Sequence, residues 1–223
     1  MRDQKGVRPR VLMTMIVKMT HTLCQNILRI VSAIKPLDLL EEKHLQETLD
    51  WINSGAPLFR IQKPDTPSKH LVSYFVLVDE KASKILLVDH KKALLWLPTG
   101  GHVENNEDPK ETVRRECLEE LHIPADFWCE DPVFLTSTIT VGLTKGHTDV
   151  SLWYVLKGDH RAPYTFDHAE FNSIQWFAFD DIPYEKSDPH MKRFVEKLKD
   201  FQNCTQLKCN MNKLIKEKIH GTY

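Results

Sequence analysis

The segment that most constrains this chain is residues 101–123, in which a glycine-led loop precedes an acidic run with helical spacing. Asp108 followed by Pro109 is typical of a helix start, because an aspartate side chain caps the first turn and proline suits the first helical position. Glu111 stands three residues after Asp108, where an acidic side chain completes a capping box. The segment therefore predicts a loop that leads into a short, well-capped helix.

Three carboxylates of this expected helix share one face. Glu116, Glu119 and Glu120 are spaced i, i+3 and i+4, so they are surface neighbours that repel one another by roughly a few tenths of a kcal/mol per pair. A Mg²⁺ ion relieves such repulsion, since it takes oxygen ligands and prefers sites that it shares with substrate phosphates. A solvated acidic surface is the alternative. The face away from the carboxylates carries an apolar stripe of Val113, Cys117 and Leu121.

The whole segment resembles the Nudix box of the Nudix hydrolases, whose pattern is G-x5-E-x7-R-E-U-x-E-E-x-G-U, with U aliphatic. The matching positions are Gly101, Glu107, Arg115, Glu116, Glu119, Glu120 and Ile123. Cys117 stands at the first aliphatic position, a mild change because a free cysteine behaves as a small hydrophobe. His122 replaces the last glycine, which normally ends the helix in a left-handed turn.

This resemblance implies an α/β fold, a Nudix-type α/β/α sandwich around a mixed β-sheet, here with N-terminal and C-terminal helical additions. It also implies a hydrolase that uses Mg²⁺, or Mn²⁺ in its place, to cleave the pyrophosphate bond of a nucleoside triphosphate or of a nucleoside diphosphate linked to another moiety. A Nudix-fold sensor or regulator that binds a nucleotide without cutting it is the alternative. The complete set of box acids argues against that alternative, and against an isopentenyl diphosphate isomerase.

The resemblance also assigns roles to single residues. Glu116, Glu119 and Glu120 are expected to ligate the metal, with Glu119 or Glu120 orienting the attacking water. Glu107 and Arg115 are expected to be structural partners that join the loop to the helix. Substrate-binding roles are expected for Gly100, Gly101 and His102. For His102, an ordinary hydrogen-bonded surface position is the alternative.

A further acid is expected outside the box. In MutT-like enzymes of this family such an acid precedes a tryptophan by six residues, and Glu170 stands six residues before Trp176 here. Glu170 is therefore a candidate fourth ligand or general base, and a solvated loop acid is the alternative.

The sequence divides into three parts: a helical extension and linker over residues 1–67, a Nudix domain over 68–200 and a helical tail over 201–223. Leu23, Ile27 and Ile34 follow helical spacing, and Asp38 caps a second helix that ends near Gly55. These two amphipathic helices are expected to pack on the core or on a second copy of the chain, as a homodimer. Strands are expected at residues 70–79, 84–89, 133–141, 149–156 and 174–179, residues 93–97 are expected to lead into the glycine turn, and helices are expected at 188–201 and 206–219.

Composition excludes few classes of function. The net charge of -1 provides no general attraction for nucleic acid or membranes, and the lysines of the last expected helix are interpreted as its solvated side. The apolar stretch from residue 11 to 19 is too short to span a membrane. Five cysteines without CxxC spacing favour reduced thiols and a cytoplasmic location. No motif identifies which nucleotide is the substrate.

Overall fold

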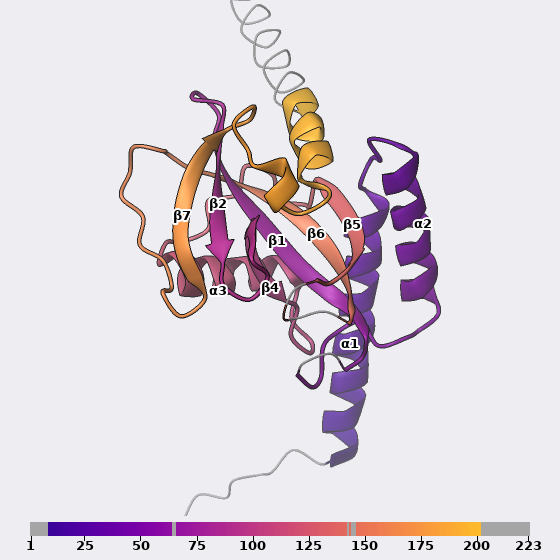
Figure 1. The fold of residues 1–223 in the computed structure, drawn as a ribbon. Coiled ribbons are helices and arrows are strands. Elements are labelled where there is room, and N and C mark those ends of the chain that lie inside the picture. Colours follow the sequence, from indigo (N-terminus) through magenta and orange to yellow (C-terminus); the bar gives the residue numbers. More distant parts are fainter. Residues whose placement is uncertain (1–8, 64–65, 142, 144–145, 202–223) are drawn as a thin grey trace, which may run out of the picture.

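A seven-stranded mixed sheet forms the centre of the computed structural model, which describes residues 9–63, 66–141, 143 and 146–201, with side chains from residue 21 onward. The strand path is β3-β2-β1-β6-β5, with β4 paired to β1 and β7 to β2 (Figure 1). The strands are β1 (Lys69–Asp79), β2 (Lys84–His90), β3 (Leu95–Leu97), β4 (Thr99–His102), β5 (Phe134–Ile139), β6 (Thr148–Lys157) and β7 (Phe171–Ala178). Each strand expected from the sequence is confirmed to within a few residues.

Strand β4 differs from the expectation, which was a glycine turn. It pairs antiparallel with β1, placing Gly100 opposite Tyr74 and Gly101 opposite Ser73. A Cβ atom on Gly100 would lie 2.2 Å from the carbonyl oxygen of Ser73, and its φ of +143° is a conformation that other residues rarely adopt. The glycine that reads as a turn residue is thus needed for a close strand pairing.

Helices cover both faces of the sheet. Leu71, Phe75 and Leu77 of β1 face one core cluster, which they share with helices α1 (Pro9–Ser32) and α3 (Pro109–Leu121). Val76 and Val78 face the opposite cluster, which is closed by a helix over residues 191–201. The short 3-10 helix η2 (Tyr184–Lys186) precedes that helix. This is the expected α/β/α sandwich.

The two expected N-terminal helices are present as α1 and α2 (Leu39–Asn53), which lie side by side near β5 (Figure 1). Asp38 caps α2 by accepting a hydrogen bond from the backbone N–H of Glu41 at 2.8 Å. The side chain of Glu41 is fully buried, and it accepts hydrogen bonds from the backbone N–H of Leu135 and from Nζ of Lys197. Both helices therefore pack against the sheet, whereas the helix expected at 206–219 lies outside the described residues.

Helix α3 begins and ends as its sequence indicates. The side chain of Asp108 accepts from the backbone N–H of Lys110, and Pro109 opens the helix. His122 caps the C-terminal end in the left-handed conformation, at φ 55° and ψ 30°. A histidine thus makes the turn that the family pattern assigns to glycine. None of the helices in the described part of the chain has the length and hydropathy that a membrane crossing requires.

Candidate functional site

The most buried acid of α3 is Glu120, whose residue is 5% exposed. Its Oε2 atom accepts a 3.0 Å hydrogen bond from the backbone N–H of Gly100. Burial raises the pKa of Glu120 well above its ordinary value, and the nearby charge of Glu116 raises it further. Strand β4 therefore holds a carboxylate in a place where its negative charge has little compensation.

Glu116 is the second acid of α3 that lies against strand β4. Burial raises its pKa, and Nη1 of Arg115, which donates to its Oε1 atom at 2.6 Å, offsets only part of that shift. A Cβ atom on Gly101 would lie 1.9 Å from the same Oε1 atom. Gly101 is thus required because the carboxylate of Glu116 lies directly against the backbone of β4.

Arg115 connects the helix to the loop that precedes it, as expected. Its Nε and Nη2 atoms donate to the two carboxylate oxygens of Glu107 at 2.9 and 3.0 Å, a bidentate pair. Burial alone would raise the pKa of Glu107, but the hydrogen bonds from Arg115, the backbone of Glu104 and Thr112 lower it below the ordinary value. Glu107 is therefore a satisfied anion with a structural role, unlike Glu116 and Glu120.

The remaining candidate acids, Glu119 and Glu170, interact with the pair of Glu116 and Glu120. The side chain of Glu119 is 60% exposed and lies 3.4 Å from Nη1 of Arg115. The charge of Glu170 raises the pKa of both Glu116 and Glu120, which places this acid beside the box although it belongs to a different segment. The backbone N–H of Asp167 donates to the carbonyl oxygen of Glu120 at 2.9 Å and so fixes the loop that carries Glu170. Three of the expected acids thus lie on one helix, and the fourth, Glu170, is near enough to interact electrostatically with two of them.

The donor set of these acids fits a hard divalent cation. All of them offer carboxylate oxygens, which are the ligands that Mg²⁺ and Mn²⁺ prefer. Two of them have raised pKa values because of burial and mutual repulsion, and a bound cation would offset both effects by stabilising the charged carboxylates.

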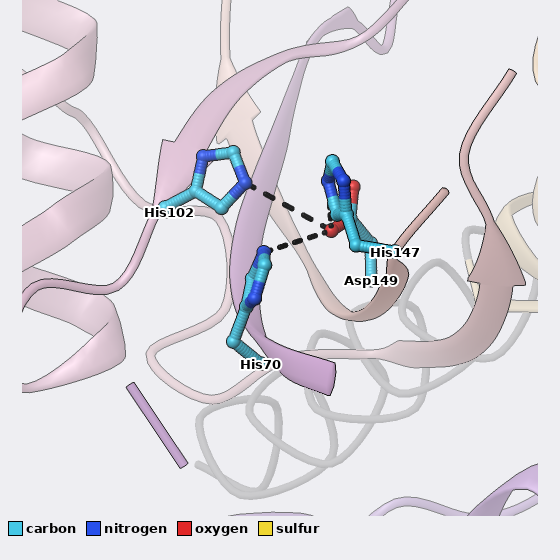
Figure 2. Close-up of side chains that lie close together, drawn as sticks. All are labelled: His70, His102, His147 and Asp149. Carbon is cyan, nitrogen blue, oxygen red and sulfur yellow. Dashed lines mark ion pairs between the residues drawn. The ribbon is translucent and has the colours of Figure 1, made fainter. Parts of the chain in front are cut away.

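His102 lies on the other face of the sheet. It pairs with Val72 of β1, while the neighbouring Gly101 pairs with Ser73, so successive residues of β4 point to opposite sides. Its ring contacts those of His70 and His147 (Figure 2). Burial lowers the pKa of His102 to about 2, and the positive charge of Arg60 contributes. His102 is therefore a neutral imidazole, separated from the acids of α3 by the strand itself.

Arg60 was missed by the sequence interpretation, which assigned its segment to a linker. Burial lowers the pKa of Arg60, whereas the charges of Asp149, Glu116 and Glu104 raise it, so the guanidinium lies near the acids of both faces. No ion pair of Arg60 is formed within the described part of the chain. The only sequence signal is an arginine between Phe59 and Ile61 in an otherwise apolar run.

Comparison with known families gives one match that covers more than half of the chain. Residues 69–198 match the family described as NUDIX domain. Among curated proteins, none matches the sequence.

Several solved structures are similar in fold. A MutT NUDIX hydrolase from Burkholderia pseudomallei is 22% identical, with a TM-score of 0.46 over 58% of this chain and 97% of its own. A NUDIX-family hydrolase from Clostridium perfringens is 21% identical, with a TM-score of 0.47 over 59% and 97%. An Ap4A hydrolase from C. elegans is 19% identical, with a TM-score of 0.45 over 58% and 96%. The match to the domain family, rather than these distant likenesses, carries the assignment.

Proposed function

Because this chain belongs to the NUDIX domain family and is a hydrolase of that family, we propose that it cleaves the pyrophosphate bond of a nucleoside triphosphate or of a nucleoside diphosphate linked to another moiety. The observation that carries this proposal is the pair of buried, poorly compensated carboxylates of Glu116 and Glu120 beside the glycine strand β4. Such a pair lowers the stability of the folded protein unless a cation, shared with a substrate phosphate, neutralises the two carboxylates.

Glu116, Glu119 and Glu120 would hold Mg²⁺, or Mn²⁺ in its place. When bound, the cation polarises the phosphorus centre, screens the approach of an anionic nucleophile and lowers the pKa of bound water. Glu120 is positioned by the N–H of Gly100, and Glu119 or Glu120 would accept the proton of the attacking water. Glu170, whose charge acts on Glu116 and Glu120 from outside the helix, is the other candidate for that proton transfer.

The substrate's phosphates would lie against β4, where Gly100 and Gly101 allow close approach to the backbone. Arg60 would pair with a phosphate, because it interacts electrostatically with Glu116 and has no ion pair of its own among the described residues. The proposed substrate is a small nucleotide or nucleotide conjugate rather than nucleic acid. A cytoplasmic location agrees with the free thiols of Cys24, Cys117 and Cys129, and a homodimer remains a prediction.

The first experiment is a panel of nucleoside triphosphates and nucleotide conjugates with Mg²⁺, followed by product mass in ¹⁸O-labelled water. Incorporation of one label into a single phosphate-bearing product is expected, because one phosphorus atom is attacked. Release of inorganic phosphate from a phosphomonoester as the main reaction would contradict the proposal.

The second experiment compares Glu119→Gln and Glu120→Gln with Glu111→Gln on the same helix. Glu111 is exposed, and among the described residues its one ion pair is with Arg114 at 3.2 Å, so it is a matched control outside the acid cluster. Turnover is expected to fall by orders of magnitude in the first two variants and to stay near wild type in the control. Near-normal rates with Mg²⁺ in both test variants would overturn the assignment.

A further inference from the structure

Four side chains converge on the sheet face opposite α3: His70 of β1, His102 of β4, His147 just before β6, and Asp149 of β6 (Figure 2). Sheet register brings them together, since His70 and Asp149 are direct partners in the parallel β1–β6 ladder. One nitrogen of each ring and one oxygen of the carboxylate all lie within 4.8 Å of one another. None of the expected roles of the box acids uses this cluster.

Three of these converging atoms are buried and unsatisfied. Nε2 of His70, Nε2 of His102 and Oδ1 of Asp149 have no hydrogen-bond partner among the described residues. His70 is completely buried, so its ring is not open to bulk solvent. Each unsatisfied buried polar atom destabilises the folded protein, and three such atoms that converge on one place are rare in native proteins.

The hydrogen bond made by Nδ1 of His70 explains why its other ring nitrogen, Nε2, has no partner. Nδ1 of His70 lies 2.7 Å from the carbonyl oxygen of Pro67, which can only accept, so Nδ1 carries the proton. In the neutral ring, Nε2 then presents a lone pair to Oδ1 of Asp149 at 3.3 Å, and two acceptors face each other. Histidines that bind metals show this same pattern, with one nitrogen fixed by a carbonyl oxygen and the other free to coordinate.

We propose that His70, His102, His147 and Asp149 bind one transition-metal ion, with Zn²⁺ as the best-fitting ion, at a site separate from the box acids. With metal–ligand bonds of about 2.0–2.1 Å, the ligands of a tetrahedral zinc lie about 3.3–3.4 Å apart. Nε2 of His70 lies 3.3 Å and Nε2 of His147 lies 3.2 Å from Oδ1 of Asp149. The corresponding distance for His102 is 3.9 Å, so this ring needs a small shift. Three imidazoles favour zinc and its neighbours over Mg²⁺, which prefers oxygen.

A phosphate is the competing occupant, because Arg60 and Lys63 interact electrostatically with His102. Against it, the carboxylate of Asp149 lies at the centre of the cluster, where an anion would meet a negative charge. The cation is therefore the occupant proposed, and phosphate binding becomes an outcome of the test.

The ion would join three parts of the chain that are distant in sequence, namely the start of β1, the end of β4 and the start of β6. Strand β4 also carries Gly100 and Gly101, and Nη2 of Arg115 donates to the carbonyl oxygen of His102 at 3.4 Å. A bound ion would thus fix β4 from the face opposite the box acids. This inference concerns a structural site and does not depend on the substrate proposed above.

The test uses untagged full-length protein that is stripped with a chelator, loaded with Zn²⁺ or Co²⁺ and dialysed against buffer with excess Mg²⁺. Elemental analysis is expected to find about one equivalent of retained Zn²⁺, and the Co²⁺ form is expected to show the strong visible absorption of a four-coordinate ion. Retention of no metal by the wild-type protein, or displacement of Zn²⁺ by Mg²⁺, would overturn the proposal. So would binding of inorganic phosphate by the metal-free protein with protection of the same histidines.

The variants are His147→Asn and Asp149→Asn, with His122→Asn as a matched control. Loss of a ligand is expected to weaken Zn²⁺ binding by at least about 100-fold, beyond the roughly 10- to 100-fold that loss of an outer hydrogen-bond partner causes. His122 is exposed at the C-terminal end of α3, where its Nδ1 lies 3.1 Å from Oγ1 of Thr165, and it belongs to no group of potential metal ligands among the described residues. Its replacement is expected to leave zinc retention unchanged. A Glu116→Gln, Glu119→Gln double variant is also expected to retain zinc, which separates this site from the box.

His102→Asn, at a ring that is 25% exposed, replaces either test variant that does not fold. Wild-type retention in the folded ligand variants would refute the site.

Discussion

At the scale of single residues, the acids of α3 and of the loop before it fall into two groups. Glu107 is satisfied by Arg115, Thr112 and a backbone N–H, and its pKa is low. Glu116 and Glu120 have raised pKa values because burial and mutual repulsion outweigh their hydrogen bonds. Carboxylates with raised pKa values are found more often at functional sites than at purely structural positions.

Glu170→Gln tests the role of the acid outside the box. If Glu170 transfers a proton, kcat should fall by at least about 100-fold at every metal concentration, the lower limit for a placed general base. If it binds a metal instead, the loss should shrink at high Mg²⁺ or Mn²⁺. Steady-state kinetics over a metal titration distinguish the two roles, with Asp167→Asn as the control from the same loop. A rate within about threefold of wild type throughout would make Glu170 a bystander.

At the scale of elements, the packing of α3 against β4 depends on Gly101, which has no side chain. Gly101→Ala is expected to displace the carboxylate of Glu116, because the added Cβ would lie 1.9 Å from its Oε1 atom. The Mg²⁺ concentration needed for half-maximal activity should therefore rise, while circular dichroism stays that of the folded protein.

The matched control for that variant is Gly55→Ala. Gly55 has a φ of +74° and no atom within 4 Å of an added Cβ, so alanine there brings backbone strain without a clash. A small loss of thermal stability with unchanged metal dependence is expected. An equal change of metal dependence in both variants would show that the effect of Gly101→Ala is not local.

One of the contacts between helix α2 and the rest of the fold is a buried charge, Glu41. Glu41→Gln removes the partner of Lys197, whose side chain is only 14% exposed, and breaking such a pair costs about 3–5 kcal/mol. Urea unfolding should therefore show a lower midpoint for Glu41→Gln than for Glu42→Gln, which changes the neighbouring exposed carboxylate. Equal midpoints would mean that α2 contributes nothing through Glu41.

At the scale of the whole molecule, the site acids make stability depend on pH and metal. A group whose pKa is higher in the folded than in the unfolded state favours folding at low pH, and this contribution is lost as the pH rises through and above the unfolded value. Glu116 and Glu120, raised above 4.5, are such groups.

Glu120→Gln is accordingly expected to raise the Tm of the metal-free protein at pH 7, by a few degrees, and to change it little below about pH 4. Added Mg²⁺ should raise the Tm of the wild-type protein, and by much less that of the variant, because a ligand has been removed. Calorimetry at several pH values measures both effects. A lower Tm of the metal-free variant at pH 7 would contradict the proposed electrostatic cost.

The sequence predicted the parts of this structure that depend on neighbours along the chain. The caps of α3, its apolar stripe and the capped start of α2 follow from short spacings. Strand β4 was not predicted, since its glycines form a strand only because β1 lies against them. The histidine cluster and the position of Arg60 were not predicted either, because His70 and Asp149 meet through the register of a ladder and no local pattern encodes register.

The central ladder of the sheet joins residues 69–78 to residues 148–157, a separation of 79 residues (148 minus 69). During translation, β1 leaves the ribosome well before its parallel partner β6 has been made. Until then, the apolar faces of β1 and α1 have no sheet to cover them, and non-local pairing of this kind is slow and open to aggregation. The order of synthesis, more than the final stability, thus determines when this protein most needs the protection of a chaperone.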